Sequence, residues 1–331
     1  PWVHLVSTIG VFLGSLFSAV WIVVANSWQQ TPAGFHIVGT GLKARAEVTD
    51  FWAMVFNPSS VDRLIHTWQG SFLAGAFLIL SVHAYYIRKN RFVFISKKAF
   101  KITLVVATFF SLSQLFSGHS SADGVAKNQP AKLAAMEGHF KKNAPADLYL
   151  FGTVNKDKKE VTGLKIDGGL SFLVHQDFQA PIKGLDSFDK NDTPSQVNAV
   201  FQFYHLMITI GMILIGLTLL ACFLWWKNKL FDYKWIMWLF SFAVILPQIA
   251  NQVGWFAAEM GRQPWVVYGL LRTSKAFSQE VSSSQIMFSL IMFTIVYSLL
   301  LALFIYMLNK KIKHGPYDEK TENLHFLTYN N

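Results

Sequence analysis

The sequence predicts an all-α fold, a polytopic transmembrane helical bundle with six helices and one extramembrane loop module. Of its 331 residues, 52% are hydrophobic and 15% are charged, whereas a typical soluble domain has about 25% charged residues. Six long runs contain no Asp, Glu, Lys or Arg, and the basic residues gather between them. The 30 Phe and 11 Trp residues also exclude a disordered chain, which is poor in aromatic residues.

Each apolar run is close to the ~20 residues that an α-helix needs to cross ~30 Å of hydrocarbon. None shows the alternation of a barrel strand, so helices are expected. Pro247 should bend the fifth helix, because proline removes a backbone hydrogen bond and clashes with the preceding turn. The runs are residues 3–25, 64–87, 102–118, 199–226, 235–258 and 281–308, of which 102–118 is the shortest.

Basic residues follow the second, fourth and sixth runs, within residues 88–101, 227–234 and 310–320. Lys and Arg in short loops mark the cytoplasmic side of a membrane protein. We therefore expect a multi-pass protein in a lipid bilayer with a cytoplasmic C-terminus. This topology accounts for the net charge of +10, and no nucleic-acid partner is needed to explain it.

The polar stretch of residues 119–198 falls on the outer side and is long enough for a small folded module. Within it, two β-prone segments at residues 148–152 and 161–166 flank a polar turn and predict a hairpin. The expected division is residues 1–118 with three helices, 119–198 as the outer loop, 199–308 with three helices, and 309–331 as a cytoplasmic tail.

Histidines within the apolar runs are candidate functional residues, because polar groups are costly in hydrocarbon. His66 and His205 lie near the outer ends of their runs, although a lone histidine there is more often an interfacial side chain than a ligand. His205 and Met207 are two residues apart, so they point about 200° apart on a helix and cannot face one cofactor together. Either of them could meet His66 across the bundle.

The strongest local signal is the run GWFAAEMGRQPW from Gly254 to Trp265. Glu259 ends a predicted transmembrane helix here, Trp255 lies one turn earlier on the same face, and Arg262 follows within reach of an anion. One interpretation is a capped helix end with a Glu and Arg pair at the membrane interface. The other is a carboxylate ligand or proton carrier beside an arginine that holds an acidic cofactor group.

This run resembles the signature of subunit I of the cytochrome bd quinol oxidases, a family of the bacterial cytoplasmic (inner) membrane. Further stretches resemble the same family in the same order, namely VANSWQQTP from Val24, Ile65-His-Thr, QPAKLAAME from Gln129, and GLSFLVHQDF from Gly169 followed by Tyr204-His-Leu-Met. The stretch from Gln129 resembles the start of the quinol-binding loop of the family. The stretch from Gly169, with the one from Tyr204, resembles members in which this loop is short. The resemblance implies a respiratory terminal oxidase that oxidises ubiquinol or menaquinol on the outside and reduces O2 to water with charge separation, together with a subunit II.

The resemblance also implies ligands for haem. His66 and Met207 match the axial ligands of a low-spin haem b. His205 is then not a ligand; many members have arginine at this position, in contact with the haem periphery. Glu259 matches the carboxylate ligand of a high-spin haem, either haem b or haem d, with Trp255 packed nearby.

The remaining implied roles concern quinol and acidic groups. Arg262 matches a partner of a haem propionate or of the quinol site. Lys132 and Glu137, in the outer loop, match the pair associated with quinol oxidation. Without the resemblance, these two residues are typical of a solvated charge combination on a helix, which contributes about 0 to 1 kcal/mol.

Members of the family have nine helices, whereas this chain has six and begins in what resembles the fourth. The resemblance therefore implies a fragment that lacks an N-terminal segment of subunit I, through a truncated gene or, less readily, a split gene. That segment carries a histidine ligand of the high-spin site. The chain alone is accordingly expected to retain the low-spin haem and not to reduce oxygen.

Two other classes of protein remain open. A transporter or channel is also polytopic, but it predicts ionisable residues near the middle of the membrane or broken helices paired between repeats. The sequence shows neither feature. A haem-free assembly subunit is the second alternative, and it predicts no visible absorbance.

Overall fold

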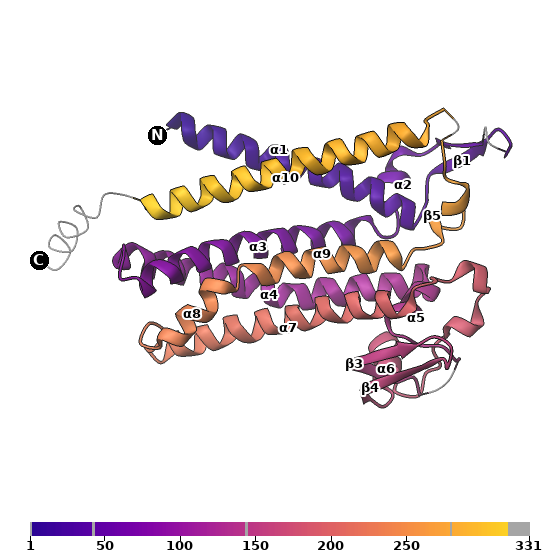
Figure 1. The fold of residues 1–331 in the computed structure, drawn as a ribbon. Coiled ribbons are helices and arrows are strands. Elements are labelled where there is room, and N and C mark those ends of the chain that lie inside the picture. The colour runs from indigo at the N-terminus through magenta and orange to yellow at the C-terminus, as the bar shows by residue number, and fades with distance from the viewer. Residues whose placement is uncertain (1, 42–43, 143–144, 279, 317–331) are drawn as a thin grey trace, which may run out of the picture. The chain divides into compact units, whose positions relative to one another are not determined.

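The computed structural model describes residues 2–41, 44–142, 145–278 and 280–316. Six helical spans in these residues are long and apolar enough to cross a membrane, which confirms the predicted all-α membrane fold. They are α1 (Trp2–Gln30), α3 (Ser60–Arg88), α4 (Val93–Asn128), α7 (Val197–Trp226), α8 (Lys234–Phe242) with α9 (Ile245–Met260), and α10 (Ser283–His314) (Figure 1). Most of the expected tail, residues 309–331, lies outside the described residues.

Two features of these helices bear on the sequence predictions. The third span was expected to be the shortest, but α4 has 36 residues and continues to Asn128. Its apolar run stops at residue 118 where polar residues begin, and a helix can continue beyond hydrocarbon. The bend predicted at Pro247 is confirmed, because α8 ends at Phe242 and Pro247 lies in the first turn of α9, where its missing N–H has no helical partner.

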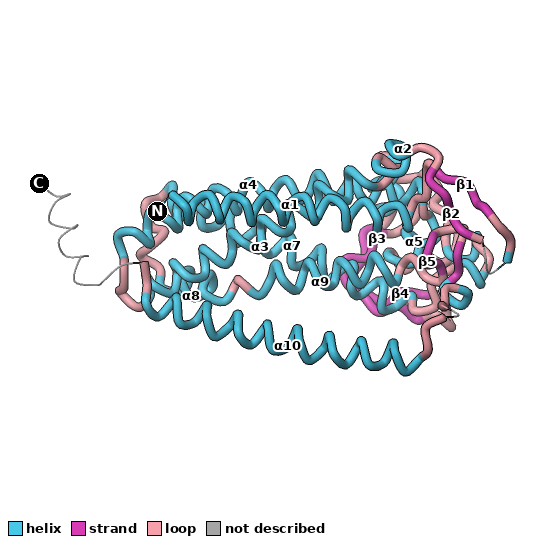
Figure 2. The backbone as a smooth tube through the Cα atoms, turned by 90° about the horizontal axis from the view of Figure 1, so that it is seen from above, coloured by secondary structure: helices cyan, strands magenta, loops and turns pink. Residues whose placement is uncertain are grey.

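The chain forms two compact units. The first unit comprises Pro1–Leu73, Phe109–Gly216 and Leu246–Ala276, and the second unit comprises Ala74–Thr108, Leu217–Ile245 and Phe277–Asn331. In the first unit, α1 and α9 end at the same end of the unit at which α3 and α7 begin (Figure 1), and we call this the polar end of the unit. Its short elements gather there (Figure 2).

The predicted hairpin is confirmed. Strands β3 (Leu148–Asn155) and β4 (Glu160–Ile166) pair antiparallel, with Asn155 opposite Glu160 beside the turn. The other elements of the polar end are β1 (Phe35–Val38) paired with β2 (Arg45–Val48), α2 (Phe51–Val55), α5 (Pro130–Met136), α6 (Gly169–His175), η2 (Leu185–Ser187), η3 (Lys190–Asp192), β5 (Trp265–Val267) paired with β6 (Leu271–Arg272), and η4 (Thr273–Lys275).

The core of the first unit joins α5 and the hairpin to α7 and α9. Its buried members come from all these elements and include Ala134, Ala135, Val154, Val200, Phe201 and Ala257. Helix α5 begins at Pro130, which suits the first turn of a helix, and each of its residues from Ala131 to Met136 is buried. The outer loop is therefore packed onto the helices through α5.

The second unit has an aromatic core. The ring of Phe240 on α8 lies 5.0 Å from that of Phe100 and 6.2 Å from that of Phe77, measured between centroids. The hydroxyl of Ser81 donates a 2.6 Å hydrogen bond to the carbonyl of Ser241. Helix α10 begins with a capping box of Ser282 and Gln285 and has no buried residue, an exposure that suits a helix facing lipid.

Gly138 provides a test of how the hairpin packs. Its φ is +63°, and a Cβ atom there would lie 2.7 Å from Cγ2 of Val161. We expect Gly138→Ala to lower the stability by about 1 to 3 kcal/mol through strain and overpacking, measured as a lower midpoint of thermal unfolding in detergent. Gly14→Ala is the control, because no atom lies within 4 Å of its Cβ position and alanine favours a helix. An unchanged midpoint for Gly138→Ala would contradict this packing.

Candidate functional site

A chain of charged and amide side chains crosses the polar end of the first unit. Nη2 of Arg262 donates to Oε2 of Glu259 at 2.5 Å, and Nη1 donates to Oε1 of Gln29 at 3.0 Å. The other carboxylate oxygen of Glu259 accepts a 2.9 Å bond from Nδ2 of Asn26. The Oδ1 atom of Asn26 in turn accepts a 2.6 Å bond from Nη2 of Arg63. This network of Arg63, Asn26, Glu259 and Arg262 links α3, α1 and α9.

Local sequence explains why these groups converge. Asn26, Gln29 and Gln30 end α1 at a spacing of three and four residues, which places them on one side of a helix. Glu259 and Arg262 lie at the end of α9, and Trp255 lies one turn earlier. The guanidinium of Arg63 stands 5.9 Å from the centroid of the Trp255 ring.

Lys132 enters the same region from α5. Its Nζ donates to Oε1 of Gln30 at 3.0 Å, and its side chain is 2% exposed. The stem passes so close to Gly261 that a Cβ atom there would lie 3.0 Å from Cγ of Lys132. Burial lowers the pKa of Lys132 well below its ordinary value, and the charge of Arg63 lowers it further while Glu259 opposes this.

Glu137 lies in a different environment at the C-terminal end of α5. It is 1% exposed, and its Oε2 atom lies 4.0 Å from Nε2 of His205. Burial raises the pKa of Glu137 to about 8, and a hydrogen bond with Tyr204 partly offsets this rise.

The alternative interpretation of Lys132 and Glu137 as a solvated charge combination was wrong. Both side chains are buried, because α5 packs into the core under the hairpin. Residues five apart on a helix point about 140° from each other, and among the described residues no ion pair joins these two. Lys132 therefore faces Gln30 and Gly261, whereas Glu137 faces Tyr204 and His205.

One ring nitrogen of His66 forms a hydrogen bond, and the other has no hydrogen-bond partner among the described residues. Its Nδ1 atom lies 3.0 Å from Oγ of Ser117, and that hydroxyl donates to Oε1 of Gln69 at 2.6 Å. A hydroxyl has one proton, so Ser117 must accept from an Nδ1–H group of His66. The remaining Nε2 atom then carries a lone pair, as required of a metal ligand oriented by its second nitrogen.

His205 differs from His66 in this respect. Its Nδ1 lies 2.9 Å from the carbonyl oxygen of Phe201 and its Nε2 lies 2.7 Å from that of Tyr149 on β3. Both nitrogens thus face backbone acceptors, which ties α7 to the hairpin. Met207 points elsewhere, and its Sδ atom lies where a Cβ atom at Gly254 would approach to 2.7 Å. The geometry therefore favours Met207 over His205 as a candidate ligand.

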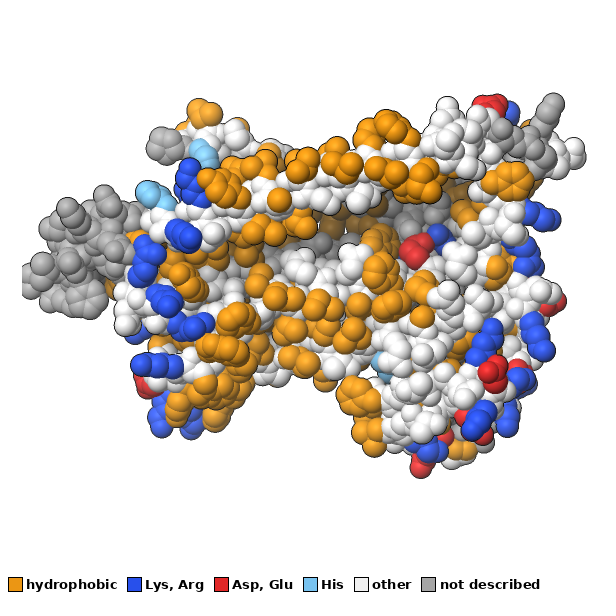
Figure 3. Space-filling view, in the orientation of Figure 1, with side chains coloured by type: hydrophobic (Ala, Val, Ile, Leu, Met, Phe, Trp, Pro, Cys, Tyr) orange, Lys and Arg blue, Asp and Glu red, His pale blue; other side chains and the backbone are white. Residues whose placement is uncertain are grey.

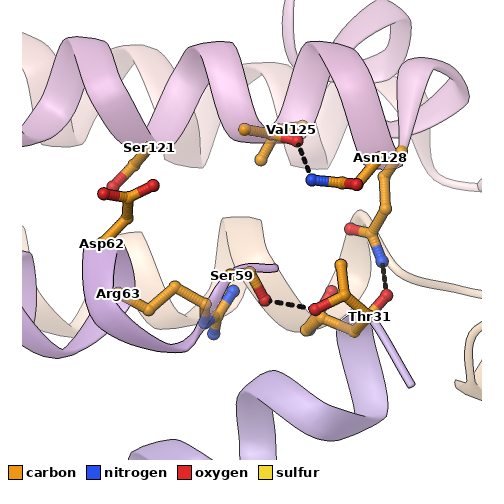
Figure 4. A pocket seen from close by; sticks show the side chains of 10 residues that line it. Thr31, Ser59, Asp62, Arg63, Ser121, Val125 and Asn128 are labelled. Carbon is orange, nitrogen blue, oxygen red and sulfur yellow. Dashed lines mark hydrogen bonds between the residues drawn. The ribbon is translucent and has the colours of Figure 1, made fainter. Parts of the chain in front are cut away.

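A small cavity of about 60 Å³, lined mainly by residues of polar type, lies beside Gln30. Figure 4 shows Asp62 and Ser121 facing each other at one side, with Ser59 bonded to Thr31 at the other. Three of its lining residues have a buried side-chain atom without a hydrogen-bond partner, namely Nε2 of Gln30, Nε of Arg63 and Oγ of Ser121. A cavity of this size and polarity has room for a few water molecules, which need about 10 to 15 Å³ each.

Four residues of the site were not predicted from the sequence, namely Asn26, Gln30, Arg63 and Ser117. Two signals were available for them. The polar end NSWQQ of the first run is unusual beside hydrocarbon, and Arg63 precedes His66 by three residues on the same helical face. Ser117, in contrast, has no signal, because serine is common in apolar helices.

The comparisons with known proteins agree on one family. The sequence profile of the family described as "Cytochrome bd terminal oxidase subunit I" matches residues 1–316. The cytochrome bd ubiquinol oxidase subunit 1 of Bacillus subtilis is 32% identical over 315 residues, with 92% of this chain and 66% of that protein covered. The cytochrome bd-II ubiquinol oxidase subunit 1 of Escherichia coli is 29% identical, with 95% of this chain and 73% of that protein covered.

A solved structure is similar as well. The bd oxidase from Geobacillus thermodenitrificans superposes with a TM-score of 0.81 at 30% identity, covering 95% of this chain and 71% of that chain. The chain thus spans about two thirds of the length of the relatives that it matches.

The raised pKa of Glu137 has a consequence for stability. Between its ordinary pKa of 4.5 and about 8, the folded chain keeps a proton that the unfolded chain has released. The free energy of unfolding should therefore fall as the pH rises through this window, by up to about 1.4 kcal/mol per pH unit. Glu137→Gln should remove this part of the slope, measured by thermal unfolding in detergent from pH 4.5 to 8.5.

The control for this experiment is Asp123→Asn. Asp123 is an exposed partner of Lys127 on α4, so its loss should leave the slope of the wild-type chain unchanged. If Glu137→Gln and the wild-type chain had the same slope, Glu137 would not be a buried acid in the folded state.

Proposed function

Because the chain belongs to the cytochrome bd terminal oxidase subunit I family, we propose that it is the haem-binding core subunit of a respiratory oxidase. In this proposal the complete complex oxidises quinol and reduces O2 to water with charge separation across a bacterial cytoplasmic membrane. The observation that carries it is the buried excess of positive charge at the polar end. Arg63 donates to Asn26, Lys132 to Gln30 and Arg262 to Glu259. One carboxylate thus stands among three cations, and an acidic ligand would balance them.

The residues present fit a low-spin haem b. His66 offers an Nε2 lone pair from α3, and Met207 on α7 offers a thioether sulfur, so these two are the proposed axial ligands. Gly254 leaves the space that the sulfur needs. Among the described residues, no three His, Cys, Asp or Glu side chains gather as they would around a bare metal ion. A haem does not need such a group, because the protein supplies only the axial ligands.

The cations fit the acidic edge of a haem. The Nε atoms of Arg63 and Arg262 are buried without a protein partner, and a propionate can accept from a guanidinium at two positions. Arg262 is the proposed propionate or quinol-site partner, and Arg63, which the sequence analysis missed, is added to it. Glu259 is the proposed ligand of a high-spin haem b or haem d, because each of its oxygens binds one donor and keeps another lone pair.

The haems, when bound, supply one-electron transfer from quinol and the reduction of O2. The chain's own residues handle the substrate and its protons. Lys132, buried beside Gln30, is proposed to donate a hydrogen bond to a quinol oxygen. Glu137, whose pKa is about 8, is proposed to exchange a proton with the substrate near neutral pH. The cavity next to Gln30, which has room for water, is the proposed path for released protons toward Asp62.

The orientation and partners are part of the proposal. Residues 119–198 form the quinol-binding loop outside the membrane, and the C-terminus lies in the cytoplasm, since the basic loops mark the cytoplasmic side. Ubiquinol or menaquinol is the electron donor. The relatives are named as oxidase subunits, which supports a subunit II as partner.

The ligand assignment is tested with a reduced-minus-oxidised absorbance spectrum of the purified chain. We expect a low-spin α-band in the wild-type chain and its loss in His66→Ala, because the iron would lose its imidazole ligand. His205→Ala should keep the band, because both nitrogens of His205 face carbonyl groups. Loss of the band in His205→Ala with retention in His66→Ala would overturn the assignment. No band in the wild-type chain after supply of haem would favour a haem-free transporter or assembly subunit.

The quinol assignment is tested in the complete oxidase. Lys132→Met keeps an apolar stem but removes the ammonium, and we expect quinol turnover to fall at least about tenfold with the low-spin band retained. Lys127→Met is the matched control, because Lys127 is an exposed lysine paired with Asp123, and its turnover should stay unchanged. Unchanged turnover in Lys132→Met would contradict the loop assignment. Loss of the haem band instead would assign Lys132 to a propionate.

A further inference from the structure

The second unit contains a cavity of about 460 Å³ that the proposed oxidase chemistry does not use. It lies where α3 ends, α4 begins and α8 begins. Three cationic side chains, Arg88, Lys97 and Lys234, line it, and no acidic residue among the described ones does. The loops that follow α3 and α7 lie at one end of this unit. Figure 3 shows Lys and Arg side chains gathered there, at the left of the view, beside hydrophobic ones.

The cations of this cavity are available to a ligand. Among the described residues, no carboxylate forms an ion pair with Arg88, Lys97 or Lys234. Asp232, two residues before Lys234, is exposed and does not line the cavity. The Nζ atom of Lys97 stands 5.3 Å from the centroid of the Phe231 ring, an aromatic contact that positions a charge without neutralising it. The cavity therefore has a net positive lining.

Apart from Asn90, the rest of the lining is apolar or aromatic. Ile87 and Met237 are buried, 9% and 1% exposed, and form its inner side. Trp235 and Trp238, 53% and 52% exposed, stand at its edge. Tryptophan is enriched at the level of lipid headgroups, where one part of the ring meets hydrocarbon and another meets water. Positive charge beside such a surface matches a ligand with an anionic head and an apolar body.

We propose that this cavity binds the headgroup of an anionic phospholipid. The phosphate lies among Arg88, Lys97 and Lys234, and the first part of the acyl chains runs along Trp235 and Trp238. Basic pockets between transmembrane helices bind anionic headgroups in this way, and the volume is within the range of about 300 to 1,000 Å³ for ligand sites. The inference does not depend on the proposed oxidase activity. Inorganic phosphate carries the same anionic group, but it has no apolar part that could contact the two tryptophans.

The experiment measures lipid binding to the purified, delipidated chain in detergent by native mass spectrometry. We expect phosphatidylglycerol to bind at a concentration at least about tenfold lower than phosphatidylcholine does. Replacing the three cations together, Arg88→Gln, Lys97→Gln and Lys234→Gln, should remove this preference. Lys97→Glu is a second variant at an exposed position, and it should weaken phosphatidylglycerol binding by itself.

The matched control removes three other lysines of the same unit, Lys227→Gln, Lys229→Gln and Lys310→Gln, none of which lines the cavity. It should keep the preference for phosphatidylglycerol. If the control and the cavity variant lost the preference equally, lipid binding would depend on the net charge of the chain. That result would overturn the proposed site. Equal binding of both lipids by the wild-type chain would also overturn it. Displacement of phosphatidylglycerol by an equal concentration of inorganic phosphate would assign the cavity to free phosphate.

Discussion

Burying several cations beside one carboxylate is the constraint that organises the polar end of the first unit. A charge removed from water loses solvation that a single contact does not restore. Glu259 therefore accepts hydrogen bonds on both oxygens, one from Arg262 and one from Asn26. The Oδ1 atom of Asn26 in turn accepts a hydrogen bond from Arg63. These bonds link three helices, and the displacement of one member would cost the others a hydrogen bond in a partly buried site.

Other local features follow from this constraint. Lys132 reaches Gln30 because Gly261 has no side chain in the way of its stem. The unpartnered Nε atoms of Arg63 and Arg262 are a further cost that the protein alone leaves uncompensated. Functional sites often retain such costs, because the groups that a ligand must meet are held in place before it binds. The same excess charge that destabilises the chain by itself is what would favour an acidic cofactor.

The sequence predicted what depends on local pattern. Apolar runs located the spans, β-prone segments around a polar turn located the hairpin, and Pro247 located the break between α8 and α9. The sequence did not predict features that depend on contacts between residues far apart in the chain. The extension of α4 to Asn128 lies beyond the apolar run, and the burial of Lys132 and Glu137 depends on the packing of α5 against α7 and α9. Asn26 and Glu259 are 233 positions apart, so neither shows its partner in a local reading.

The two histidines near the polar end show the same limit at the level of single atoms. In the sequence, His66 and His205 are equivalent, since each is an imidazole near the end of an apolar run. Their neighbours make them different. A hydroxyl that already donates to Gln69 leaves His66 with a lone pair on Nε2, whereas two carbonyl groups engage both nitrogens of His205. Whether a histidine can bind a metal therefore depends on its surrounding hydrogen bonds. The residue type and its depth in the membrane do not determine this by themselves.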